Sequence, residues 1–439
     1  MKHKTFVLLL VIMLLAGSAG AFALDFGVTV SSSTEVSVTD TTDVAETAKA
    51  AVYLNHWFSP KLETSLQGSY TYTLDRLYLF DVDHAYARLR TPVQSGETPW
   101  YFDGQAGRFV FRDFTGNVLA SSADGARVNF QLAGTTVKVG AGYFGLLAKE
   151  NSSIILSKTD LSDSTNDDKF LAPPRAFFLL NISMPQYLGR QSVDLSFVAQ
   201  KDYRSESDLA TDEGLLDTQY VGIGLSGPLA SSLYYNSYAY LEGGRMLTNV
   251  GGFYEYHTIG AFLGGLGLRY FASGARSSVG ELSFLFSSGD SDFGSYYEGN
   301  TADHATMFQG ITAPGFGVAF SPKLGNLMVL RANYSVKPFS GSGYTAMENF
   351  QARLAGFGFF RPTDGVISEA GINPASDAMY LGSEADLILS FRPFSDLGFA
   401  LSSGIFMPNS GSALSNAAFL DDVQKKFQFV GRFDLSFTF

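Results

Sequence analysis

Residues 427–439, FQFVGRFDLSFTF, end the chain with an apolar residue at almost every second position. The intervening residues are mostly polar, among them Gln428, Arg432, Asp434 and Thr438. A period of two predicts a β-strand with one apolar face and one polar face. In a soluble sandwich the apolar face packs on a second sheet, whereas in a transmembrane barrel it faces lipid and the polar face lines an aqueous lumen.

The same alternation recurs along the chain. Ala126, Val128, Phe130 and Leu132 alternate with Arg127, Asn129 and Gln131, and comparable segments cover residues 327–337 and 380–391. Charged residues within these segments lie mostly on the polar side. That side is therefore too polar to be buried in the interior of a soluble β-sandwich. Beyond the amino terminus there is no apolar run of about 18 residues that would mark a membrane helix. Because only helices and closed barrels span lipid, a membrane-embedded chain would be a barrel.

The amino terminus, MKHKTFVLLLVIMLLAGSAGAFALD, has the layout of a secretory signal peptide. It has a basic head, an apolar run over residues 6–15 and a small-residue cleavage site at residues 21–23. We expect the signal peptide to cover residues 1–23, so that the mature protein has 439 − 23 = 416 residues. The absence of cysteine excludes a disulfide-stapled secreted protein. The net charge of −12 argues against nucleic acid as a partner.

Short and long connections alternate between the expected strands. Four short ones carry a proline, Pro60, Pro228, Pro322 or Pro393, which ends ladder pairing and favours a turn. Long polar and acidic stretches lie between them, for example near residues 149–170 and 287–310. Short periplasmic turns and long extracellular loops are typical of outer-membrane barrels. The sequence therefore predicts an all-β transmembrane antiparallel barrel of about 18 strands, with 16 as the alternative, formed by residues 24–439 as one domain.

Two resemblances agree with this fold. The last residues resemble the insertion signal of bacterial outer-membrane proteins, which implies recognition of Phe433, Leu435, Phe437 and Phe439 by the barrel assembly machinery, after handling by periplasmic chaperones. The stretches 107–145 and 380–409 resemble outer-membrane porins of the alginate-export and phosphate-selective type. The shared features are a Gly-Arg strand, an Asp-Gly strand start, and a Gly-x-Glu-x-Asp-Leu strand before a proline turn.

Arginines on polar strand faces are the strongest functional signal. If their strands are neighbours, five of them line one sector of the lumen and favour anions: Arg88, Arg90, Arg108, Arg112 and Arg127. Three carboxylates, Glu281, Glu384 and Asp386, are candidates for an opposing acidic wall. The alternative is that these charges pair with one another and hold the wall and its loops in place.

Signals for other chemistry are weak. Ser295 and His304 share a loop, but no spacing signature supports a catalytic pair, and no phosphate loop, zinc spacing or dinucleotide fingerprint is present. We therefore expect no catalytic residues, no metal and no cofactor.

The sequence predicts a porin in the bacterial outer membrane. Its partners would be outer-membrane lipid and small hydrophilic solutes, which would diffuse passively through an arginine-lined lumen that favours anions. A surface-exposed barrel acting in adhesion or envelope structure is the alternative function. A homotrimer is one assembly that the sequence leaves open.

Overall fold

A computed structural model describes residues 24–39, 41–74, 79–93, 100–206, 209, 214–272, 274, 276–302, 304–344, 346–411, 418–419 and 427–439. The predicted signal peptide, residues 1–23, lies outside the described residues. The strands are β1 (Leu24–Val38), β2 (Thr42–Ser59), β3 (Leu62–Thr73), β4 (Leu79–Val93), β5 (Trp100–Arg112), β6 (Ala120–Leu132), β7 (Thr135–Tyr143), β8 (Arg175–Leu188), β9 (Gln191–Asp202), β10 (Leu215–Pro228), β11 (Leu233–Val250), β12 (Phe253–Phe271), β13 (Val279–Ser287), β14 (His304–Ala305), β15 (Leu327–Val336), β16 (Gln351–Phe360), β17 (Tyr380–Phe391), β18 (Leu397–Pro408) and β19 (Gln428–Thr438). A 3-10 helix, η1 (Lys149–Asn151), and one α-helix, α2 (Lys158–Thr165), complete the described elements. Among the described residues, no helix is both long enough and apolar enough to cross a membrane.

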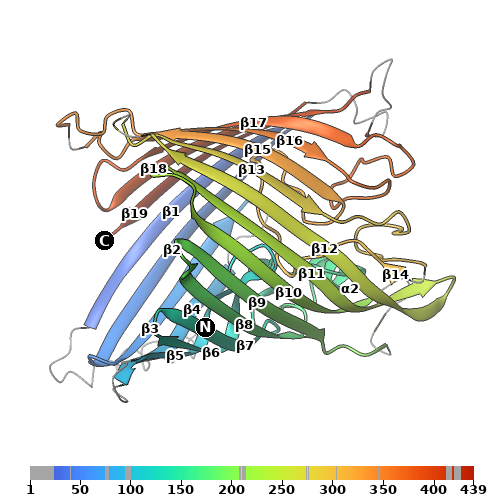
Figure 1. Cartoon of the computed structure of the whole chain (residues 1–439), viewed down its shortest axis with the longest axis horizontal. Helices are drawn as coiled ribbons and strands as arrows, with labels where there is room; N and C mark the ends of the chain where they lie inside the picture. Colours follow the sequence, from blue (N-terminus) through green and yellow to red (C-terminus); the bar gives the residue numbers. More distant parts are fainter. Residues whose placement is uncertain are drawn as a thin grey trace.

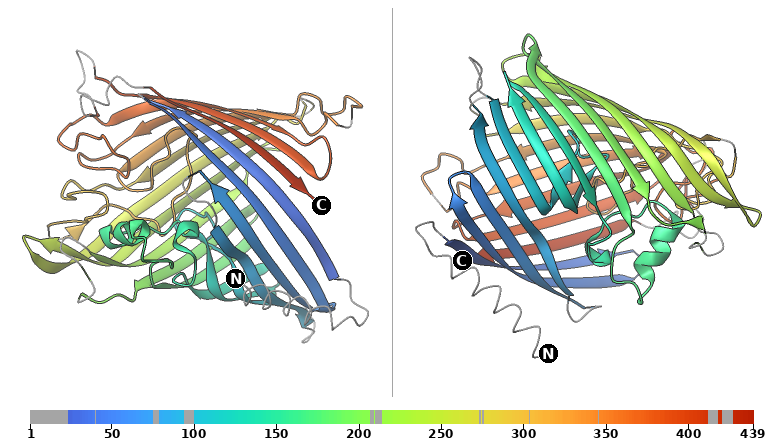
Figure 2. Two further views of the ribbon diagram at one scale, coloured as in Figure 1. Left: turned by 180° about the vertical axis from the view of Figure 1, so that it is seen from behind. Right: turned by 90° about the horizontal axis from the view of Figure 1, so that it is seen from below.

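The strands form one closed antiparallel sheet (Figure 1). Each long strand pairs with its neighbours in sequence, and β19 pairs with β1 from Thr29 opposite Thr438 to Val38 opposite Phe429. The two-residue β14 pairs in parallel with β12 and stands outside the closed ladder, which leaves 19 − 1 = 18 barrel strands in the described part of the chain. The predicted barrel of 18 strands is confirmed, and so is the closure of the last strand on the first. In both views of the seam, β1 runs beside β19 (Figure 2).

The two ends of the barrel differ in their connections. At one end, which we call the turn end, most connections are short, such as residues 60–61 between β2 and β3 and 189–190 between β8 and β9. At the other end, the loop end, residues 144–174 join β7 to β8 and residues 288–326 join β13 to β15. The predicted asymmetry is confirmed. One turn prediction is wrong, because Pro322 lies within the long 288–326 connection, where residues 306–326 contain no strand.

The cross-strand register separates two faces around the barrel. One face carries polar pairs, for example Gln105 opposite Arg127 and Glu281 opposite Asn333. The opposite face carries apolar side chains exposed on strand after strand: Val30, Val52, Leu89, Phe130, Ile223, Leu241, Leu266, Phe284, Leu330, Leu354, Leu387, Ile405 and Phe433. An aqueous lumen and a lipid-facing exterior explain this division. The described strands all belong to this single sheet, so no second sheet of described residues covers either face.

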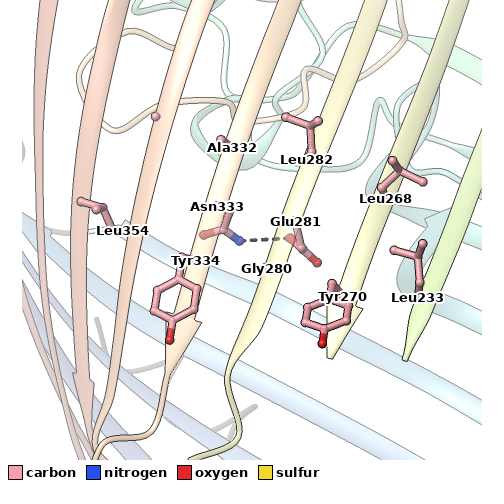
Figure 3. Close-up of a pocket in the computed structure, with 11 residues that line it drawn as sticks. Leu233, Leu268, Tyr270, Gly280, Glu281, Leu282, Ala332, Asn333, Tyr334 and Leu354 are labelled. Carbon is pink, nitrogen blue, oxygen red and sulfur yellow. Dashed lines mark hydrogen bonds between the residues drawn. The ribbon is translucent and has the colours of Figure 1, made fainter. Parts of the chain in front are cut away.

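A shallow depression on the outer face shows the character of this surface near the turn end. It is lined by leucines, including Leu268, Leu282 and Leu354, and by Tyr270 and Tyr334. Figure 3 shows both tyrosine hydroxyls pointing toward the ends of their strands, away from the leucines. Aromatic residues with one polar atom are typical of the membrane–water boundary of barrels. The leucines therefore mark the hydrocarbon level and the tyrosines its edge.

The assignment of faces predicts the effect of a charge on each side of β1. Val30 lies on the outer face, and we expect Val30→Arg to lower the free energy of unfolding by about 2–4 kcal/mol, because a guanidinium in the hydrocarbon region is costly. Denaturant unfolding of the protein refolded into lipid vesicles measures this effect.

The matched control is Ser33→Arg on the lumen face of the same strand, where Asp434 lies opposite. We expect this variant to stay within about 0.5 kcal/mol of the wild type, as surface substitutions usually do. An equal loss in both variants would contradict the assigned faces.

Candidate functional site: the lumen and its inward loops

Several connections from the loop end fold inward and fill part of the lumen. They include residues 113–119, 144–174, 288–326 and 361–379, and each contributes to one buried apolar cluster, for instance through Leu119, Phe144, Phe308 and Ile367. Their partners on the wall include Phe111 and Tyr240. The remaining passage is therefore narrower than the barrel, and its chemistry depends on which wall residues the loops leave uncovered.

The shortest inward loop is organised by one carboxylate. The buried Asp113 accepts hydrogen bonds from the backbone amides of Thr115 and Leu119, at 2.9 and 2.8 Å, and from the hydroxyl of Tyr240 at 2.6 Å. Phe114 stacks on the Tyr240 ring with 5.3 Å between centroids, and Asn117 donates to the Tyr238 hydroxyl at 2.8 Å. These contacts fasten the β5–β6 loop to β11, so the loop crosses the lumen and does not project outward.

A buried ion network holds α2 inside the loop end. Asp160 and Asp202 form ion pairs with Arg175, on β8, at 2.9 and 2.8 Å. Arg204 bonds the same two aspartates and also Asp163. Ser157 caps the helix and exchanges hydrogen bonds with Asp160 in a capping box. The aspartates and arginines form ion pairs with one another, which is the condition under which buried charges are tolerated.

Glu384 and Asp386 face the lumen but lie beneath a loop. Glu384 accepts hydrogen bonds from the backbone amides of Ala319 and Phe320 at 2.7 and 2.9 Å, and Asp386 accepts one from Val318 at 3.2 Å. Both carboxylates are almost completely buried. The prediction that they form a solute-facing acidic wall is therefore wrong, because the 288–326 loop uses them as its anchor. The Cβ of any residue other than glycine at position 317 would lie 2.3 Å from Glu384, so this contact requires Gly317.

Glu281, the third predicted carboxylate, does line the lumen. It bonds Arg269 and accepts a hydrogen bond from Asn333 at 3.0 Å (Figure 3). Along the closed sheet β13 is nine strand-to-strand steps from β4, half of the circumference, so Glu281 lies across the barrel from Arg88.

Three of the five predicted arginines lie on the lumen face. Arg88 forms a two-pronged contact with Asp103, at 2.8 Å from Nε and 2.5 Å from Nη2. Arg90 bonds Glu63 at 3.1 Å. Arg127 donates to Gln105 at 2.6 Å and lies over the Phe109 ring, with 5.0 Å from Cζ to the centroid. The alternative interpretation, that lumen charges pair with one another, holds for Arg88 and Arg90.

Arg108 and Arg112 correct the prediction of a five-arginine wall. They share the outer face of β5 with Val110, while Phe109 faces the lumen beneath the inward loops. Near the loop end Arg108 bonds Asp124 at 2.8 Å and the carbonyl oxygen of Leu146 at 2.8 Å. Local alternation cannot reveal this arrangement, because the buried loops make an aromatic lumen face favourable at this level.

Three lumen cations were missed by the sequence analysis: Lys138 on β7, Arg331 on β15 and Arg353 on β16. With Arg127 they form a set of four that have no ion pair to a carboxylate of the described residues. The Nε groups of the three arginines are buried without a hydrogen-bond partner among these residues. Arg331 alternates with apolar neighbours in the 327–337 segment that the sequence predicts to be a strand. Its position on the polar face of that strand was the signal that could have identified it as a lumen residue.

The four unpaired cations occupy two facing sectors. Arg127 and Lys138 stand on the adjacent strands β6 and β7, and Arg331 and Arg353 on the adjacent strands β15 and β16. β6 and β15 are eight steps apart in the 18-strand order, close to half of the circumference. Positive charge is thus presented to the lumen from both sides.

The fold does not bring Ser295 and His304 together as a hydrogen-bonded pair. His304 shares a hydrogen bond of 2.8 Å with the Thr258 hydroxyl, whereas Ser295 accepts one from the backbone amide of Glu298 at 3.2 Å. Within the described ranges, no group of three or more His, Cys, Asp and Glu residues is placed to hold a metal ion.

Fold and lumen together define the class: the chain has the fold of a bacterial outer-membrane porin, as expected from the sequence. It is similar in structure to three proteins of Pseudomonas aeruginosa. OccK11 (OpdR) matches with a TM-score of 0.54 and 12% identity over 94% of this chain and 95% of that chain. OpdL matches with 0.55 and 12% identity over 95% and 98%, and OccK1 (OpdK) with 0.54 and 10% identity over 94% and 98%. No protein-family model matches the chain, and no curated protein matches it.

The ion network of α2 predicts that loss of one carboxylate loosens the 144–174 loop. We expect Asp160→Asn to destabilise the loop by about 3–5 kcal/mol, because removing one partner leaves buried arginines short of negative charge. Limited proteolysis of the folded protein in detergent measures the opening of this loop. Asp168→Asn is the matched control, since Asp168 is exposed in the same loop. Equal cleavage of both variants would contradict the prediction that the Asp160 ion network holds this loop in place.

Acid should weaken the same network. Burial by itself raises the pKa of Asp160, but Arg175, Arg204 and the Leu156 amide outweigh it and lower the pKa below its usual value. A lowered folded-state pKa gives stability that is present above the unfolded-state value of about 3.9 and is lost as the pH falls through the folded-state pKa. Proteolysis with an acid-active protease should therefore accelerate below about pH 4 in the wild type, and the advantage over Asp160→Asn should shrink there. A wild-type loop equally resistant at every pH would contradict this expectation.

Proposed function

We propose that the protein is an outer-membrane channel through which small hydrophilic solutes diffuse passively, with a preference for anions. The porin fold and the lipid-facing exterior support the channel. Passive diffusion fits a lumen that is narrowed by loops but still lined by polar side chains that water reaches. The mature chain would lie in the bacterial outer membrane, with the loop end outward, as in barrels of this architecture.

The unpaired cations carry the proposed preference for anions. Guanidinium groups stay charged at any physiological pH, and their planar donors suit carboxylate and phosphate oxygens. Arg127, Arg331 and Arg353 form no ion pair with a carboxylate of the described residues, whereas Arg88 and Arg90 pair with Asp103 and Glu63. A pore lining with net positive sectors concentrates anions even though the whole chain is acidic, since selectivity follows the local field.

Reconstitution into a planar lipid bilayer tests both parts of the proposal. We expect discrete conductance steps, and a reversal potential of the sign for anion preference under a potassium chloride gradient. The triple variant Arg127→Glu, Arg331→Glu, Arg353→Glu should reverse that sign, because six units of charge change within the lumen.

Arg190→Glu is the control, since it makes the same exchange at an exposed position in the short 189–190 turn between β8 and β9. Its reversal potential should stay close to that of the wild type. A folded protein without conductance would overturn the channel, and an unchanged reversal potential in a conducting triple variant would overturn the role of these cations.

A further inference from the structure

A separate cavity of about 260 Å³ opens in the lumen wall beneath the β5–β6 loop. Its wall comes from β9, β10 and β11, and its roof from Phe114, Thr115 and Asn117 of the loop. At about 30 Å³ per water molecule, it has room for roughly nine waters or one small cyclic solute. It contains none of the arginines that carry the proposed anion preference.

The cavity is held open by contacts already described for the loop. Phe114 is fixed by stacking on Tyr240, and Asn117 by its hydrogen bond to Tyr238. Gly224 lies on the wall below the loop. A Cβ at this position would lie 2.6 Å from the Phe114 ring, so only glycine allows the loop to approach the wall this closely. Such pre-formed walls lower the entropy cost of binding.

The wall offers polar groups that remain available. Ser226 and Asn236 lie directly opposite each other on β10 and β11, and neither side chain has a hydrogen-bond partner among the described residues. Asp194 accepts a hydrogen bond from Ser183 through Oδ1, which leaves Oδ2 without a partner in that part of the structure. An amide both donates and accepts, a hydroxyl does the same, and a carboxylate accepts. This mixture suits a solute with several hydroxyl groups.

Aromatic surface and charge narrow the solute class further. The rings of Phe114 and Tyr238 border the same cavity and can pack against the C–H face of a sugar ring, while polar groups bind its edge. Asp194 is the one ionisable carboxylate in the lining, and no Lys or Arg lines it. A carboxylate without a cation disfavours anionic solutes.

We propose that this cavity is a lumen subsite for a neutral monosaccharide. The proposal rests on the proposed channel function and extends it: one barrel would combine an anion-favouring passage with a weak sugar-binding step on its wall. The sugar would meet Ser226 and Asn236 through its hydroxyls and the two aromatic rings through its apolar face.

Isothermal titration of the detergent-solubilised, folded full chain tests the subsite without requiring conduction. The probes are D-glucose, D-glucuronate and ethanolammonium. We expect weak binding of glucose, and weaker or undetectable binding of glucuronate because its carboxylate meets Asp194. The double variant Ser226→Ala, Asn236→Ala should bind glucose about tenfold more weakly, from the loss of two hydrogen-bonding groups.

Asn333→Ala is the matched control, since Asn333 is a lumen asparagine on β15 outside this cavity, and it should leave glucose binding unchanged. Asp194→Asn should keep glucose binding within a few-fold, because an amide oxygen still accepts. Absence of glucose binding to the folded wild type would overturn the proposal. So would binding of ethanolammonium that depends on Asp194 in place of glucose, which would identify a cation site.

Conductance is measured on the same preparations. A protein that conducts salt but does not bind glucose refutes the subsite alone, whereas a protein that binds glucose and does not conduct refutes the channel. Glucose binding that survives in the double variant would also refute the subsite, because it would place the sugar elsewhere.

Discussion

The hydrogen-bonded seam between β1 and β19 is the constraint on which the rest of the structure depends. In hydrocarbon an unpaired backbone amide or carbonyl costs several kcal/mol, so a sheet can enter a membrane only when it has no edge. Ten residue pairs, from Thr29 to Val38 on β1, join the first strand to the last. Closure turns the alternation of each strand into two continuous surfaces, one apolar and one polar, and the lumen exists only as a result.

Charge inside the barrel serves two purposes that the geometry separates. Carboxylates such as Asp113, Asp160 and Glu384 are buried and fully occupied by loop backbone or by arginines. They give the inward loops fixed positions, because a buried charge without partners would be costly. The cations Arg127, Arg331 and Arg353 form no direct ion pair with a carboxylate of the described residues, although Asp103, Glu281 and Asp386 lie within electrostatic range of them. In the proposed function, anchoring and selectivity therefore come from different members of one polar wall.

Inward loops also create surfaces that a bare barrel lacks. The β5–β6 loop brings Phe114 over Gly224 and Asn117 to Tyr238, and so converts a flat stretch of wall into a walled cavity. Phe109 and Phe111 are also buried on the lumen face, where Phe111 packs against Phe177 of β8. Binding properties of the lumen therefore depend on loop placement as much as on strand composition.

The sequence by itself predicted the barrel, a count of about 18 strands with 16 as the alternative, and its two unlike ends. It also predicted the lipid-facing set that includes Phe433 and Phe437, because side-chain alternation is a local property with a period of two. It also placed Arg88, Arg90 and Arg127 correctly on the polar face. Only the tertiary structure decided that Arg108 and Arg112 face outward, that Glu384 and Asp386 lie beneath a loop, and that Arg331 and Arg353 stand across from Arg127. Those facts depend on contacts between residues far apart in the chain, and on which loops turn inward, for which a strand's own pattern carries no signal.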